Sequence, residues 1–183
     1  MKRLNIIISL IIICSYLLSL PSTTQAQKGK IRLSLDASVT QRLGLDTDIT
    51  IKYCRPGVKG RVIWGELVPY DKVWRAGANE NTTIEFNNDL LIQGQKLTAG
   101  KYGFWIIPSK KDWTIIFSKV NNAWGLKYAG QEQDALRVTV TPVKAPHQEW
   151  LIYGFDDLAG TSATAYLYWE QLKAPIKIEL AQK

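Results

Sequence analysis

The sequence predicts an all-β fold: a single-domain β-sandwich of about nine strands with one long aromatic and basic loop. From residue 30 onward the chain is a succession of short segments in which apolar and polar residues alternate, which is the period of a half-buried strand. Each segment is bounded by glycine, proline, asparagine or aspartate, which favour turns. No stretch of useful length has a helical period. A small β-barrel is the alternative arrangement of the same strands.

The alternating segments place the expected strands at 31–35, 49–53, 82–87, 90–93, 102–107, 113–119, 136–140, 150–155, 163–169 and 176–180. Apolar residues occupy both faces of 150–155, so this strand is expected at the centre of its sheet. Asn87, Asn88 and Asp89 suggest a hairpin between the two strands that flank them. A break is expected at 142–146, which has a proline at each end.

Tyr102 occupies the position of the tyrosine in a tyrosine-corner motif. Residues 97–102 have the spacing of this motif, in which the phenol hydroxyl anchors a connection between two sheets through a backbone hydrogen bond. The motif favours two sheets packed face to face. A plain turn before a strand is the alternative interpretation.

Residues 1–26 resemble a secretory signal peptide. Lys2 and Arg3 precede an almost wholly apolar run, 4–20, and 21–26 resembles a cleavage site with small residues. Cleavage is expected after Ala26, which leaves a domain of residues 27–183 in the periplasm or outside the cell. A retained membrane anchor is the alternative, because the apolar run is close to the lower limit for spanning a bilayer.

Loss of the signal changes both the charge and the cysteine content. The formal net charge falls from +7 to +5 because Lys2 and Arg3 are removed. The remaining charge is mildly basic and scattered, which suits an anionic ligand or an envelope surface. No nucleic-acid partner is expected, because an exported protein would rarely meet one. Cys14 is also removed, so Cys54 has no partner for an internal disulfide. No membrane span is expected in the mature chain.

The segment 53–80 is the longest that fits neither a strand nor a helix period. Its aromatic side chains are interleaved with arginine and lysine. A connection of this length inside a domain is usually a binding or catalytic loop or a packed Ω-type loop. The candidate ligand-binding residues are therefore Tyr53, Arg55, Trp64, Tyr70, Trp74, Arg75, Asn79 and Glu80.

Two interpretations of this segment stay open. In the structural one, Trp64, Tyr70 and Trp74 fold down as a lid on one end of the sandwich. In the functional one, the aromatic rings line a shallow cleft in which a few polar groups, Arg75 and Glu80 among them, orient a sugar or another small polar ligand. Arginine would also pair with a carboxylate or phosphate.

Cys54 shares a strand face with Thr50 and Lys52 and is followed by Arg55. A nearby cation would lower the pKa of the thiol and make it reactive. The preferred alternative is a small residue partly covered by the loop, because the sequence shows no base that would activate the thiol.

Other candidate chemistry is weaker. His147 is the only histidine, which excludes a multi-histidine metal site, and its place in a turn favours a solvated side chain over a catalytic base. No zinc-ligand spacing is present, and the paired aspartates at 46 and 48 and at 156 and 157 lack the pattern of a calcium loop. We therefore expect no metal and no cofactor.

Longer motifs resemble a known family. They are YxRPGxKGR at 53–61, WGxLVPY at 64–70, VWRxGANE at 73–80 and LxAGxY at 97–102. They resemble the bacterial family called domain of unknown function 2911, and the similarity extends over nearly the whole mature chain. The resemblance implies an exported β-rich protein of Bacteroidetes type, and it implies no activity.

Three functions follow as hypotheses. The first is an exported, non-enzymatic sandwich that binds a small polar or anionic ligand, or an envelope component, through the 53–80 loop. The second is a hydrolase-like enzyme in which Glu80 acts as acid or base while Arg55 and Arg75 stabilise negative charge. The third is a purely structural or protein-interaction domain. The mutual geometry of Arg55, Arg75, Asn79 and Glu80 distinguishes among them.

Overall fold

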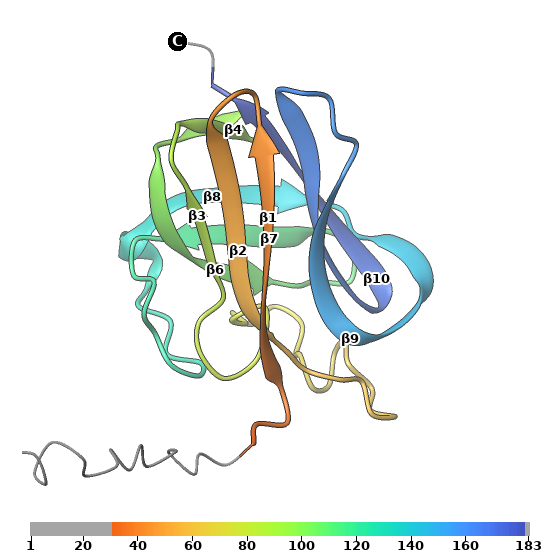
Figure 1. Ribbon diagram of the computed structural model, residues 1–183. Coiled ribbons are helices and arrows are strands. Elements are labelled where there is room, and N and C mark those ends of the chain that lie inside the picture. The colour runs from red at the N-terminus through yellow and green to blue at the C-terminus, as the bar shows by residue number, and fades with distance from the viewer. Residues whose placement is uncertain (1–30, 182–183) are drawn as a thin grey trace, which may run out of the picture. The chain divides into compact units, whose positions relative to one another are not determined.

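Two antiparallel sheets pack face to face in the computed structural model, which describes residues 31–181 (Figure 1). The sheets do not close into a barrel, so the predicted sandwich is confirmed and the barrel alternative is wrong. The expected signal peptide, residues 1–26, lies outside the described residues. Within the described part of the chain, no helix is long and apolar enough to cross a membrane.

The larger sheet has six strands and the smaller has four. The six-stranded sheet has the order β1-β2-β3-β6-β7-β8, with bounds Leu35–Leu43 (β1), Thr47–Arg55 (β2), Thr83–Phe86 (β3), Gly100–Ile107 (β6), Trp113–Ser118 (β7) and Asp134–Val140 (β8). The four-stranded sheet has the order β5-β4-β10-β9, with bounds Leu90–Ile92 (β4), Gln95–Leu97 (β5), Val143–Asp156 (β9) and Ser162–Leu180 (β10). A single 3₁₀ turn, Gln131–Gln133, is the only helical element among residues 31–181.

The core lies between the two sheets. Alternate residues of β2, such as Ile49 and Ile51, face inward, and alternate residues of β10, such as Leu167 and Trp169, face them from the other sheet. Period-2 alternation gives each strand one apolar face, and burying that face is the main favourable term in folding. The alternation read from the sequence therefore identifies most of the core.

Part of the outer face of the six-stranded sheet is also covered. Trp105 is almost completely buried but lies outside the core cluster. Tyr128 packs edge-on against it, with ring centroids 5.5 Å apart, and the amide of Asn81 donates a hydrogen bond to the carbonyl of Ala123 at 3.0 Å. Residues 119–130 thus lie over the outer face of this sheet, beside the end of the 53–80 loop.

The tyrosine corner is confirmed. The hydroxyl of Tyr102 donates a hydrogen bond to the backbone carbonyl of Thr98, with an O···O distance of 2.8 Å. Thr98 and Ala99 connect β5 in the four-stranded sheet to β6 in the six-stranded sheet. The phenol therefore anchors the chain where it crosses from one sheet to the other.

Substituting Tyr102→Phe is expected to lower the free energy of unfolding by about 1 kcal/mol, the typical net value of one hydrogen bond. The phenyl ring keeps its packing, so the loss is confined to the hydroxyl's contacts with Thr98, to the carbonyl at 2.8 Å and with Oγ1 at 3.1 Å. Urea denaturation of the purified protein measures this change. Tyr166→Phe is the matched control, because the Tyr166 hydroxyl has no hydrogen-bond partner among residues 31–181. An equal loss in both variants would contradict the anchoring role.

Two predicted elements are placed wrongly near the ends of the chain. The strand expected at 31–35 is absent, and β1 begins only at Leu35. Leu33 and Leu35 are exposed, so their alternation did not mark a buried face. The strands expected at 163–169 and 176–180 are one continuous strand, β10, whose pairing with β9 contains bulges near Glu170.

Two further expectations about pairing are wrong. Residues 87–89 do not close a hairpin, because β3 pairs with β2 and β6 while β4 pairs with β5 and β10. These residues cross between the sheets instead. The strand expected at the centre of a sheet, 150–155, belongs to β9, which is an edge strand. β9 also runs through the break expected at 142–146, with Pro146 inside the strand.

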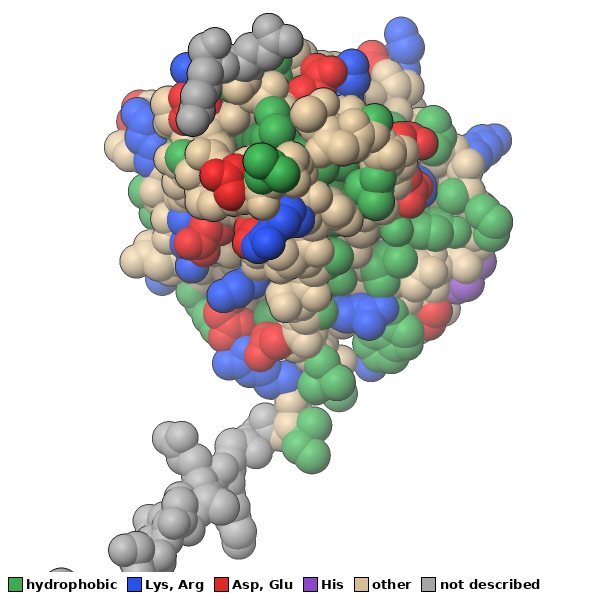
Figure 2. Space-filling view, turned by 45° about the horizontal axis from the view of Figure 1, so that its top comes forward, with side chains coloured by type: hydrophobic (Ala, Val, Ile, Leu, Met, Phe, Trp, Pro, Cys, Tyr) green, Lys and Arg blue, Asp and Glu red, His purple; other side chains and the backbone are tan. Residues whose placement is uncertain are grey.

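Charges of both signs are mixed on the surface. On the face seen in Figure 2, Lys and Arg side chains are interspersed with Asp and Glu. This agrees with the scattered charges of the sequence. A charged site on this protein is therefore defined by contacts between individual side chains.

Candidate functional site

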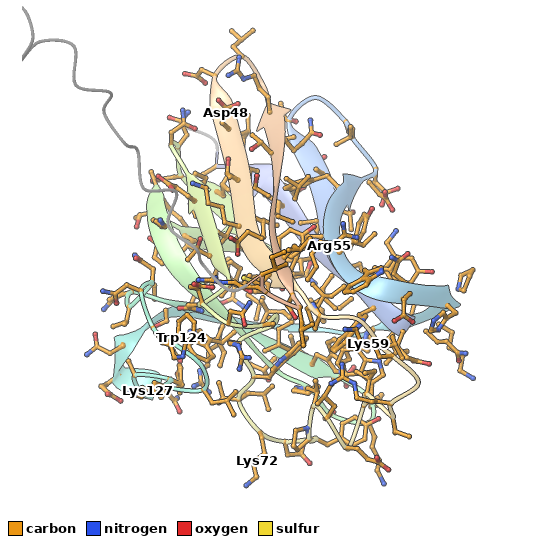
Figure 3. The ribbon with its side chains drawn as sticks, turned by 60° about the horizontal axis from the view of Figure 1, so that its bottom comes forward. Asp48, Arg55, Lys59, Lys72, Trp124 and Lys127 are labelled. Carbon is orange, nitrogen blue, oxygen red and sulfur yellow. The ribbon has the colours of Figure 1, made fainter. Side chains whose placement is uncertain are left out.

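The 53–80 loop is attached to both sheets. Gly57 forms an isolated β-bridge with Trp150 of β9, in the four-stranded sheet. Trp74 forms another with Ile106 of β6, in the six-stranded sheet, through hydrogen bonds of 2.8 and 2.9 Å. The loop therefore closes the end of the sandwich at which β1 begins, while Lys59 and Lys72 project from it (Figures 1 and 3).

Its two tryptophans join a cluster in the core. The Trp74 ring stacks on Trp169 with centroids 5.9 Å apart, and only 7% of Trp74 is exposed. The Trp64 ring lies 4.5 Å from Trp113 and 6.0 Å from Trp169. This is the packing of the structural interpretation, in which the loop is a lid, and it leaves little of either ring for a ligand.

The two predicted tyrosines also pack inward. Tyr53 is buried, with its ring edge-on to Tyr153 at 4.7 Å. Tyr70 is half-buried against Gly65, whose φ of +93° and lack of a side chain allow the close approach; a Cβ there would lie 2.9 Å from the Tyr70 ring. The four predicted aromatics thus do not line one cleft together.

The two predicted arginines do not converge with Glu80. The Nε of Arg55 donates a hydrogen bond to the carbonyl of Leu151 at 3.0 Å, which joins β2 to β9. Arg75 makes no ion pair or side-chain hydrogen bond within residues 31–181, and its Nε is buried without a partner. Burial lowers the pKa of Arg75, and its interaction with Cys54 acts in the opposite direction without overcoming this.

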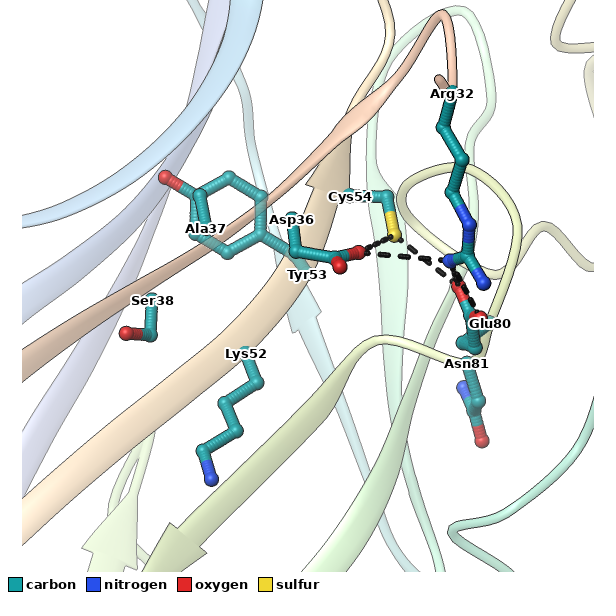
Figure 4. Close-up of a pocket in the computed structure, with 9 residues that line it drawn as sticks. All are labelled: Arg32, Asp36, Ala37, Ser38, Lys52, Tyr53, Cys54, Glu80 and Asn81. Atoms are coloured by element: carbon teal, nitrogen blue, oxygen red, sulfur yellow. Dashed lines mark hydrogen bonds and ion pairs between the residues drawn. The ribbon is translucent and has the colours of Figure 1, made fainter. Parts of the chain in front are cut away.

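A different polar cluster forms around Cys54. In the β1–β2 ladder Asp36 pairs directly with Cys54, so both side chains leave the outer face of the six-stranded sheet together. The Sγ of Cys54 lies 3.0 Å from Oδ1 of Asp36 and 3.4 Å from Oε2 of Glu80 (Figure 4). Only 3% of Cys54 is exposed. The single thiol proton is therefore shared as a hydrogen bond between the carboxylates of two residues that are distant in the sequence.

Arg32 completes the cluster from the segment that precedes β1. Its Nη1 lies 2.6 and 2.7 Å from the two carboxylate oxygens of Glu80, and 3.7 Å from Oδ1 of Asp36. The Arg32 side chain is 47% exposed. Arg32 is thus the cation that forms ion pairs with both carboxylates in the described structure (Figure 4).

Local backbone geometry holds Asn79 and Glu80 in place. Asn79 has a left-handed φ of +55°, which asparagine tolerates well, and its Nδ2 donates to the carbonyl of Ser34 at 3.0 Å. The backbone at Gly77 packs against β2: a Cβ there would lie 2.7 Å from Oγ1 of Thr82 and 3.2 Å from the Cys54 carbonyl. A side chain at Gly77 would push the loop away from the thiol.

The electrostatics of the cluster make Cys54 inert and keep Glu80 ionised. Burial, followed by hydrogen bonds to Asp36 and Glu80, raises the pKa of Cys54 to about 12. Burial also acts to raise the pKa of Glu80, but hydrogen bonds from Arg32, its own backbone and Cys54 outweigh it and lower that pKa. Arg55, the cation considered for the thiol, donates to β9 instead, so the structure agrees with the preferred interpretation of Cys54 as a small residue covered by the loop.

These side chains border an open hollow of about 610 Å³ on the outer face of the six-stranded sheet. We call it the Cys54 hollow. It is lined by Arg32, Asp36, Ala37, Ser38, Lys52, Tyr53, Cys54, Glu80 and Asn81 (Figure 4). Charged groups of both signs meet here around a buried thiol.

One possible donor set for a metal is present. Asp36, Cys54 and Glu80 each offer a ligand atom, and these atoms all lie within 4.8 Å of one another. A metal ion would have to displace both the tightly held proton of Cys54 and the guanidinium of Arg32. Spacing along the sequence could not reveal this set, since its members are 18 and 26 residues apart.

Sequence reasoning therefore identified part of this site. Glu80 was among the predicted residues and borders the hollow, Tyr53 contributes to its lining, and Asn79 fixes its edge. Arg32 and Asp36 were not predicted. The signal for Asp36 was its pairing with Cys54 in the β1–β2 ladder, and the strand expected at 31–35 ended one residue before it.

Comparison with known proteins gives one match. A family model described as protein of unknown function (DUF2911) matches residues 34–178. No curated protein and no solved structure matches the chain. The matched range includes every strand of both sheets, apart from the last two residues of β10, and all of the hollow except Arg32.

Proposed function

Because the chain belongs to the DUF2911 family, whose description assigns no activity, we propose from its geometry that it is an exported protein that binds a small polar ligand in the Cys54 hollow. The expected signal peptide supports a periplasmic or secreted location. The main support for the proposal is that the buried Cys54 thiol is hydrogen-bonded to Asp36 and Glu80 at the edge of an open hollow. Polar groups converging in a concavity are the usual mark of a ligand site.

Binding is favoured over hydrolysis by the state of Glu80. Its lowered pKa makes it a weak proton acceptor, and it is not held protonated as a general acid would be. Arg55, which the hydrolase hypothesis needs beside it, is bonded to the carbonyl of Leu151. The thiol is also protonated and buried, so it is no nucleophile at neutral pH.

A larger anionic envelope component is the second candidate. It is supported by the lysines that surround the loop end of the domain, including Lys59, Lys72 and Lys127 (Figure 3). These side chains have no carboxylate within ion-pair distance among the described residues. The surrounding acidic residues Glu66 and Asp71 weaken this surface, so the hollow is the better-supported site.

A thermal-shift screen against sugars, amino acids, short peptides and phosphates tests the proposal. A compound that binds the folded protein raises its melting temperature by an amount that grows with the logarithm of the ligand concentration relative to Kd. We expect Ser38→Trp, which fills the hollow from β1, to abolish the shift caused by any hit. Thr40→Trp is the matched control, because Thr40 is the next exposed residue of the same face and does not line the hollow.

The screen has two outcomes that contradict the proposal. One is that no compound in these classes raises the melting temperature. The other is a hit whose effect survives Ser38→Trp unchanged, which would place the ligand elsewhere. In either case the structural or protein-interaction hypothesis would be favoured.

A further inference from the structure

We infer that the Cys54 hollow takes a ligand that carries a guanidinium or primary ammonium group, and that Arg32 holds the place of that group in the ligand-free protein. The inference rests on the proposed function, since it names the ligand class of the same hollow. Three observations support it: the carboxylates of the hollow, the exposure of Arg32 and the position of Trp124.

The two carboxylates of the hollow attract a cation, and Lys52, which also lines the hollow, forms no ion pair with either of them. Asp36 and Glu80 place two carboxylates around the Cys54 thiol, and the thiol stays neutral at physiological pH because its pKa is about 12. Within residues 31–181, Arg32 is the sole cation that pairs with either carboxylate. Carboxylates in a concavity bind guanidinium and ammonium groups through charge-assisted hydrogen bonds.

The contacts of Arg32 allow its guanidinium to move away from the two carboxylates. It precedes β1 and belongs to no strand, whereas Asp36, Cys54 and Glu80 are fixed by the ladder and the loop. Its side chain is half exposed, and ion pairs between exposed groups are weak because water and salt screen them. A ligand cation can therefore exchange with Arg32 without disturbing either sheet.

Trp124 supplies a second feature that suits a cation. Glu80 and Trp124 form an isolated antiparallel bridge, and directly opposed residues in such a bridge project their side chains to the same side. The indole is 56% exposed although it is bracketed by backbone hydrogen bonds to Asn79 and Asn81. An exposed indole beside a carboxylate matches the recognition of organic cations through their attraction to the ring face.

Isothermal titration of the purified protein with agmatine, 1,4-diaminobutane and succinate tests the inference. Agmatine offers a guanidinium and an ammonium group, 1,4-diaminobutane offers ammonium groups alone, and succinate is a small dianion. We expect both cations to bind and succinate not to bind. Arg32→Ala should tighten the binding of the cations at least fivefold, because it removes the internal competitor.

Two further variants and one control locate the effect. Glu80→Gln should weaken binding at least tenfold, and Trp124→Ala should weaken it severalfold. Arg42→Ala is the matched control, because Arg42 of β1 forms a similar exposed ion pair with Asp48 of β2, away from the hollow. It should leave the affinity unchanged.

The inference and the proposed function fail in different ways. Cation binding that is unchanged or weaker in Arg32→Ala overturns the inference, as does the absence of cation binding to both the wild type and Arg32→Ala. If a compound of another class is then lost in Ser38→Trp, the proposed function still stands. If no compound of any class responds to Ser38→Trp, both are overturned.

Discussion

Replacing Trp74 with alanine is expected to lower the free energy of unfolding by about 3–5 kcal/mol, the usual cost of truncating a large aromatic side chain in a core. Trp74 belongs to the loop, yet its ring stacks on Trp169 and lies 5.9 Å from Trp64. Truncation would leave a cavity where the lid meets both sheets. Urea denaturation monitored by far-ultraviolet circular dichroism measures the change without depending on tryptophan emission.

Trp124→Ala is the matched control for this experiment. Trp124 also lies in an irregular segment, but 56% of it is exposed, so its truncation removes little buried surface. We expect a change within about 0.5 kcal/mol. Similar effects in both variants, or a small effect of Trp74→Ala, would contradict the assignment of the loop tryptophans to the core.

Alkylation of Cys54 in the folded protein should be slower than that of free cysteine by at least about a thousandfold at pH 8. The raised pKa, from 9.0 to about 12, lowers the thiolate fraction by roughly this factor, and burial of the thiol slows the reagent further. Iodoacetamide labelling followed by mass spectrometry gives the rate. The same protein unfolded in urea is the control and should label as free cysteine does.

The pH dependence of this rate gives an independent check. A thiol with an ordinary pKa gains reactivity up to about pH 9 and then levels off. For Cys54 the folded protein favours the protonated thiol, so the rate should rise about tenfold per pH unit from 7 to 10 with no plateau. A plateau below pH 9 would mean that Asp36 and Glu80 do not hold the proton.

The fold could be predicted because most strands have one buried and one exposed face. Ile49, Ile51 and Tyr53 alternate with polar residues, and the structure buries all three. β1 was missed because Gln41 interrupts its inward face, although outward positions such as Ser38 and Thr40 are polar. Leu33 and Leu35 also alternate with polar residues, but both side chains are exposed. Pattern alone therefore mislocated the strand that carries Asp36.

The candidate site could be predicted only in part, for two physical reasons. Tryptophans in a loop have the same composition whether they cap a core or line a cleft, so Trp64 and Trp74 could not be assigned before their neighbours were known. The surroundings of Cys54 depend on strand register, which pairs it with Asp36. Its sequence neighbour Arg55 suggested an activated thiol, whereas its spatial neighbours are carboxylates.

The edge position of β1 makes the Cys54 hollow conditional on local opening. Among the strands of residues 31–181, β1 is hydrogen-bonded to β2 alone, so it can fray from this edge without unfolding either sheet. When β1 frays, Asp36 and Arg32 move away from Cys54 together, and the buried thiol becomes accessible to solvent. The terminal strand therefore sets both the lifetime of the hollow and the moments at which Cys54 is open to oxidation.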